Sequence, residues 1–151
     1  MFHGILLAID GSTASRESSA VARRLAGRLS SEVLVVHVRI RHYSGVAAWS
    51  AEPSSHVEAC LHEVLEQMRS DGVAVRQVLA DAPHGHVGKA IAAIAAEESV
   101  DIIVMGSTRS PREALPLGSV ATRTLHFARC PVLIVKDVDA SGSEIHLGPA
   151  A

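Results

Sequence analysis

The stretch DIIVMGSTRSPREALPLGSV, residues 101–120, decides the fold of this 151-residue chain. Residues 102–105 form a short apolar run rich in β-branched side chains, which is typical of a parallel strand buried on both faces. Gly106 then allows a sharp turn or a close approach of the backbone to a ligand. Ser119, which follows Gly118, is a good N-cap for a helix. The stretch therefore predicts a strand, a loop and the start of a helix.

The loop between Gly106 and Gly118 has two interpretations. Small residues leave backbone N–H groups accessible at a helix N-terminus, where unpaired donors and the helix dipole favour phosphate. Glycine after a strand and Gly-Ser before a helix are also common at plain turns and caps. The loop alone leaves both interpretations open.

The composition predicts one globular domain with its own core. Hydrophobic residues make up 48% of the chain, and its length suits a single domain. The net charge is −2, the basic residues are scattered and aromatic residues make up only 3%, which argues against a nucleic-acid partner. No segment is long and apolar enough for a signal peptide or a membrane span, so we expect no membrane partner. Cys60 and Cys130 are expected to be buried free thiols in a reducing cytoplasm.

Apolar runs alternate with helical periodicity along the rest of the chain. The predicted strands cover residues 5–9, 33–38, 73–79, 102–105 and 131–136, and the predicted helices cover residues 14–29, 57–68, 87–95 and 120–128. We interpret residues 39–53 as a loop, residues 81–85 as a turn and residues 137–151 as a flexible tail. This alternation predicts an α/β fold, a single-domain doubly wound parallel sheet of five strands with helices on both faces. Ligands of such sheets bind beyond the carboxyl ends of the strands, where Asp10 and Gly106 lie.

Several motifs, in this order along the chain, resemble the universal stress protein family. They are AIDGS at residues 8–12, VVHV at 35–38, DIIVMGS at 101–107, GSVA at 118–121 and CPVLIVK at 130–136. The resemblance implies a universal stress protein domain over residues 1–136 with the adenine nucleotide alpha hydrolase-like fold. It also implies the strand order 3-2-1-4-5 and a homodimer formed through the last strand, Val132 to Lys136.

One branch of that family binds ATP, and the resemblance extends to its site residues. Asp10 would contact the adenosine, Val38 would flank the adenine, and Gly106 would approach the phosphates. The full set of candidate nucleotide-binding residues is Asp10, Gly11, Ser12, Val38, Met105, Gly106, Arg109, Gly118, Ser119 and Val120. The implied ligand is ATP, with or without Mg²⁺, or a related adenine nucleotide.

The loop departs from the branch pattern, which is G-x-x-G, nine residues, and then G-S or G-T. Arg109 occupies the second glycine position, and only Ser110 to Leu117 separate it from Gly118. Either the loop has lost a phosphate-binding N–H, or the Arg109 guanidinium replaces it with bidentate contacts. A third interpretation makes Arg109 an exposed loop cation.

Other chemistry has weaker support in the sequence. Asp10 is either a ligand of the nucleotide or a cap of the helix that follows Gly11. Neither the His84 and His86 pair nor His56 with Cys60 supplies a full set of metal ligands, so no metal site is predicted. Walker A, G-x-G-x-x-G and catalytic-triad patterns are missing, so no catalytic residue is predicted.

Three functional hypotheses follow. The leading one is a cytoplasmic, homodimeric stress-response protein that binds ATP or a related adenine nucleotide as a sensor or regulatory module, with at most slow hydrolysis. The alternative is a nucleotide-free dimeric interaction or adaptor module of the same fold. An enzyme that acts on a nucleotide substrate is the third.

Overall fold

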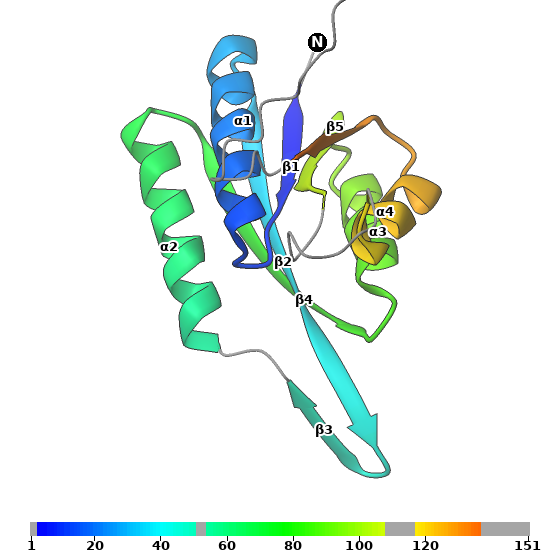
Figure 1. Ribbon diagram of the computed structural model, residues 1–151. Helices are drawn as coiled ribbons and strands as arrows, with labels where there is room; N and C mark the ends of the chain where they lie inside the picture. The colour runs from blue at the N-terminus through cyan, green and yellow to red at the C-terminus, as the bar shows by residue number, and fades with distance from the viewer. Residues whose placement is uncertain (1–2, 51–53, 108–116, 137–151) are drawn as a thin grey trace, which may run out of the picture.

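The computed structural model describes residues 3–50, 54–107 and 117–136 (Figure 1). The elements, in chain order, are β1 (Gly4–Ala8), α1 (Thr13–Leu29), β2 (Glu32–Ser44), β3 (Ala47–Ser50), α2 (Ser54–Ser70), β4 (Val75–Pro83), α3 (Val87–Glu97), β5 (Ile102–Gly106), α4 (Ser119–Phe127) and β6 (Val132–Val135). The predicted site residue Arg109 and the predicted tail 137–151 lie outside the described residues.

Five of the strands form a parallel sheet in the order β4-β2-β1-β5-β6. This is the predicted order 3-2-1-4-5 and it is confirmed. The strand order reverses between β1 and β5, because the chain extends the sheet from β1 toward β4 on one side and toward β6 on the other. A ligand site is therefore expected at the carboxyl ends of these two strands.

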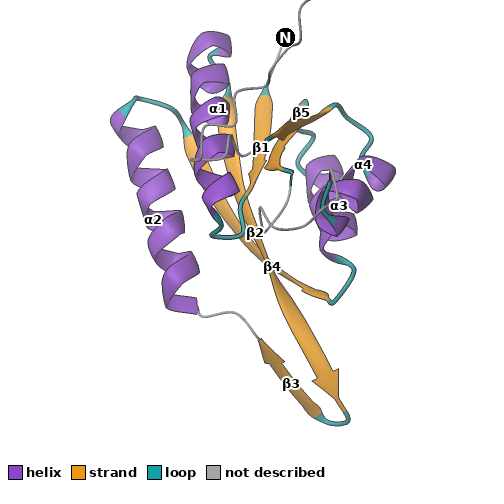
Figure 2. Cartoon of the chain, viewed as in Figure 1, coloured by secondary structure: helices purple, strands orange, loops and turns teal. Residues whose placement is uncertain are grey.

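Helices cover both faces of the sheet, as predicted (Figure 2). Alternate residues of β1 point to opposite faces, so Ile5 and Leu7 belong to the core under α1 and α2. Leu6 belongs to the second core, under α3 and α4, together with Ile91 and Ile103. An apolar run without polar alternation is the sequence signature of such a strand, buried on both faces.

The segment predicted as a loop over residues 39–53 is instead largely strand. β2 continues to Ser44, and β3 folds back against it with His42 opposite Trp49 and Ser44 opposite Ala47. Gly45 provides the positive φ, +60°, that a tight hairpin turn requires. We call residues 41–50 the hairpin arm, which projects beyond the rest of the sheet (Figure 1). Its side chains are polar, small or aromatic except for Val46, which is fully exposed, so hydrophobic periodicity did not predict it.

The third predicted strand is also longer than expected, because β4 runs through part of the predicted turn at residues 81–85. Its parallel ladder with β2 extends from Val33 opposite Val75 to Arg41 opposite Pro83. Asp81 lies between two arginines of β2, 3.0 Å from Arg41 and 2.8 Å from Arg39. Hydrogen bonding from Arg41, assisted by Arg39, holds the pKa of the Asp81 carboxyl below its usual value. Through Arg39 and Arg41, Asp81 thus joins β4 to β2 at the base of the hairpin arm.

Cys60 and Cys130 are free thiols, as predicted. Both are half-buried, whereas the sequence predicted that they would be buried. Desolvation raises the pKa of both thiols, which disfavours the nucleophilic thiolate. Among the described residues, no helix combines the length and the apolar character needed to cross a membrane.

Candidate functional site

A cavity of about 230 Å³ lies at the carboxyl ends of β1 and β5, on the face of the sheet that α3 and α4 cover. Its walls come from the end of β1 and the turn after it, and from β2 and β5. The segment between β4 and α3, the start of α3 and the first turns of α4 complete them. The cavity therefore occupies the position that the strand order predicts for a ligand.

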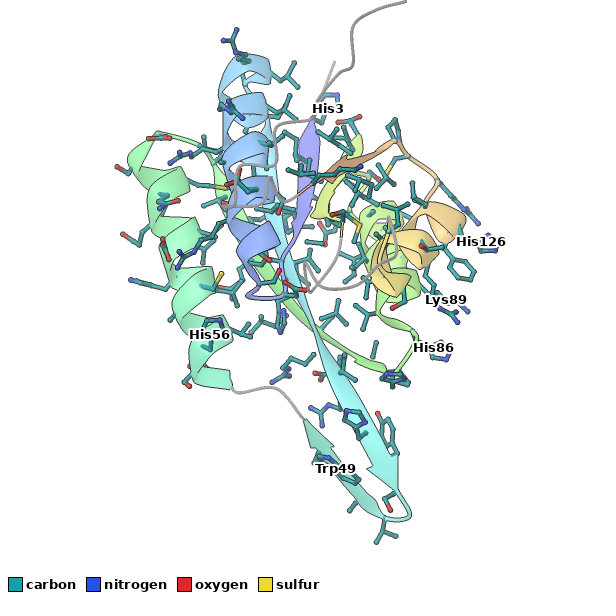
Figure 3. The ribbon with its side chains drawn as sticks, in the orientation of Figure 1. His3, Trp49, His56, His86, Lys89 and His126 are labelled. Carbon is teal, nitrogen blue, oxygen red and sulfur yellow. The ribbon has the colours of Figure 1, made fainter. Side chains whose placement is uncertain are left out.

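Most of the predicted nucleotide-binding residues line this cavity. They are Asp10, Ser12, Val38, Met105, Gly106, Gly118, Ser119 and Val120. Gly11 is not part of the lining. Its φ of +83° turns the chain, and its carbonyl accepts a hydrogen bond of 3.0 Å from Nε2 of His56 at the start of α2 (Figure 3). Arg109 is the predicted site residue that lies outside the described part of the chain.

Asp10 holds the turn between β1 and α1 in shape. Its Oδ1 accepts a hydrogen bond of 2.9 Å from the Ser12 backbone N–H and another of 2.9 Å from the Ser15 hydroxyl. The Asp10 backbone N–H donates to Ser15 Oγ at 3.0 Å. Asp10 thus fixes the turn that leads into α1, whose N-cap is Ser12 without a side-chain cap bond, and Asp10 also lines the cavity. Ser15, only 3% exposed, was missed because its role depends on the turn and not on a motif.

The wall formed by β2 is apolar. Val36, Val38 and Ile40 alternate along the strand toward the cavity, and Met105 of β5 lines it as well. His37 points to the other face, where it is buried and its Nδ1 lies 2.8 Å from the Ile9 carbonyl. His37 is therefore a buried residue that does not line the cavity. An apolar wall of this kind suits a planar base.

The start of α4 forms the polar end of the cavity. The N-cap is Gly118 and not the predicted Ser119, because Gly118 is extended and its carbonyl accepts the first helical hydrogen bond, from Thr122 at 3.0 Å. The Gly118 N–H donates to the Ser107 carbonyl at 2.7 Å, which joins the helix start to the end of β5. Ser119 is the first helical residue and is exposed. Backbone N–H groups of a first helical turn have no partner within the helix, so this end favours an anion.

The contact between α3 and α4 closes the cavity, and sequence reasoning missed it. A Cβ atom on Gly88 would lie 2.7 Å from the Val120 carbonyl oxygen and 2.8 Å from the Thr124 nitrogen, so only glycine permits this approach. Arg123 of α4 brings a positive charge to the lining, and His84 joins it from the end of β4. The sequence feature that could have indicated this contact is Gly88, a glycine inside a helical pattern.

Comparisons with known proteins agree with this architecture. Residues 1–136 match the model of the universal stress protein family. A universal stress protein of Thermus aquaticus is 34% identical over 143 residues, which cover 90% of this chain and 100% of that protein. The universal stress protein from Archaeoglobus fulgidus in complex with dAMP superposes with a TM-score of 0.68 at 23% identity, covering 89% of this chain and 98% of that one. A universal stress protein in complex with cAMP gives a TM-score of 0.68 at 19% identity, covering 89% and 97% of the two chains. The two superpositions show a shared fold.

Proposed function

Because this chain belongs to the universal stress protein family, we propose that it binds ATP or a related adenine nucleotide as a sensor or regulatory module in the cytoplasm. One observation carries the proposal. A single cavity at the β1 and β5 strand ends combines an apolar wall, the Asp10 carboxylate and the N-terminus of α4. Relatives of the same fold are known in complex with dAMP and cAMP, which supports an adenine ligand.

Each part of the cavity suits one part of a nucleotide. The adenine packs against Val38 and Met105, since both line the apolar wall. Asp10 accepts a hydrogen bond from a ribose hydroxyl at the end of β1. The phosphates, with Mg²⁺ where ATP is bound, face the first-turn N–H groups of Ser119 and Val120. Arg109 follows Gly106 by three positions in the sequence, and we include its guanidinium among the phosphate ligands.

Replacing Ser119 with aspartate separates phosphate recognition from folding. Asp at the start of a helix interacts favourably with the helix dipole, so stability should be kept or slightly raised. The same carboxylate repels a phosphate, so the affinity for ATP should fall about tenfold while that for adenosine changes little. The measurement is the ligand-dependent shift in melting temperature of nucleotide-stripped protein with adenosine, AMP, ADP and ATP, each with and without Mg²⁺.

Ser119→Asn is the matched control, because it has nearly the same shape as aspartate and no charge. It should bind ATP almost as the unmodified protein does. An equal loss of adenosine and ATP binding in Ser119→Asp would show that the phosphates do not lie at α4. A chain that shows no shift with any of these nucleotides would favour the nucleotide-free adaptor instead.

We also propose a homodimer through β6. The strand pairs with β5 on one side, and its residues Val132–Val135 are all half-buried. The outer edge of such a strand offers backbone groups for pairing with a second copy. Sedimentation velocity should then give twice the chain mass of 15.9 kDa. A single species of the chain mass at micromolar concentration would exclude the dimer there.

A further inference from the structure

We propose that the hairpin arm carries a second ring-binding subsite, continuous with the cavity, that accepts an additional planar aromatic ring attached to the adenine nucleotide. It consists of His42, Trp49 and His84, which we call the aromatic row. This inference rests on the proposed function, since the nucleotide in the cavity positions the additional ring.

The apolar wall of the cavity continues directly into the aromatic row. Side chains alternate along a strand, so His42 lies on the same face of β2 as Val38 and Ile40, which line the cavity. His42 is paired with Trp49 across the hairpin arm, and paired side chains share a face. The two ring centroids are 5.9 Å apart with an interplanar angle of 23°. Figure 3 shows Trp49 on the hairpin arm, beyond the body of the sheet.

His84 joins the aromatic row to the cavity. It lines the cavity at the end of β4, and its ring centroid lies 6.1 Å from that of His42 at an interplanar angle of 31°. The three rings therefore extend from the cavity at His84, past His42 on β2, to Trp49 on β3. A ligand that occupies the cavity can place a second ring against them.

The aromatic row has free surface for another ring. The Trp49 side chain is 50% exposed, and His84 is exposed as well. The chain has a single tryptophan and a single tyrosine, and both lie on the hairpin arm. Tyr43, 65% exposed, is adjacent to His42 in the strand and so points to the opposite face. Flat side chains of this kind attract nucleobases and other planar rings by stacking.

The ligand class is an adenine nucleotide with a second planar ring, and two linkages satisfy it. The ring is joined either through the phosphates, as in a dinucleotide, or to the exocyclic amine of the purine. Because Trp49 is the only tryptophan, its fluorescence reports on the aromatic row alone. The probes are AMP, diadenosine tetraphosphate and AMP benzylated on its exocyclic amine.

At least one probe with two rings should bind about tenfold tighter than AMP, the gain expected of one stacked ring, and should quench Trp49. AMP should leave the fluorescence nearly unchanged. The better of the two probes identifies the linkage. Calorimetry then compares variants: Trp49→Ala should lose the tenfold advantage and Trp49→Phe should keep part of it. Tyr43→Ala, on the opposite face of the hairpin arm, should keep it all.

Two results would overturn the inference in distinguishable ways. If AMP binds and neither two-ring probe binds tighter, or if Trp49→Ala keeps the advantage, the subsite is wrong and the proposed function stands. If no adenine ligand binds at all, both the subsite and the proposed function fail.

Discussion

Replacing Gly88 with alanine should lower the free energy of unfolding by about 2 kcal/mol, although alanine is the better helix former. The added methyl group would lie 2.7 Å from the Val120 carbonyl oxygen and 2.7 Å from Arg123 Cβ. Because one of these contacts is to backbone, α3 and α4 must move apart. Val120 and Arg123 both line the cavity, so nucleotide affinity should fall with stability. Urea unfolding followed by circular dichroism measures the first effect, and calorimetry the second.

Gly27→Ala is the matched control for this prediction. Gly27 is also helical, in α1, and no atom from elsewhere in the described structure lies within 4 Å of the position that an added methyl group would take. That variant should therefore gain about 0.5 kcal/mol from helix propensity alone. A Gly88→Ala protein as stable as Gly27→Ala would show that the two helices can separate without cost.

Asp10→Ala should cost about 2 kcal/mol of folding stability and most of the affinity for adenosine. The substitution removes the acceptor of two hydrogen bonds, from the Ser12 N–H and the Ser15 hydroxyl. Hydrogen bonds to a charged group contribute about 1.5–3 kcal/mol. The proposed ribose contact is lost with them. Chemical denaturation and adenosine titration of the same preparation measure the two losses together.

Asp10→Asn and Ser15→Ala separate the two roles of Asp10. Asparagine keeps a side-chain oxygen for Ser12 and Ser15, so the turn should survive while the charge is lost. Ser15→Ala removes one partner of the carboxylate and leaves the carboxylate itself. If adenosine binds Asp10→Ala as tightly as the unmodified protein, Asp10 only stabilises the turn between β1 and α1, and the proposed ligand contact is wrong.

The fold was predictable because its strands are buried on both faces. Runs such as residues 5–9 and 33–38 have no polar alternation, and this favours a parallel sheet covered by helices. Periodicity predicted five strands but not their order, which came from the family resemblance. The hairpin arm was not predicted because its strands are not buried in this way. Its residues lie outside both cores, so no hydrophobic pattern marks them.

From the residues alone, the candidate site was predictable at strand ends and at one helix start, while Val38 came from the family resemblance. Asp10, Met105 and Gly106 lie at the ends of apolar runs, and Gly118 precedes a helical pattern. Gly88 and Arg123 reach the cavity through the packing of α3 on α4, a contact between helices that a single sequence does not specify. His84 enters because β4 extends past its predicted end to Pro83.

The strand β2 is long enough to connect the cavity with the hairpin arm. A single strand, Glu32–Ser44, begins in the core, passes the cavity at Val38 and ends at the tip of the hairpin arm. From Val38 to Ser44 the strand covers about 20 Å at the usual rise per residue. One unbroken strand therefore supplies both a wall of the cavity and one side of the hairpin arm.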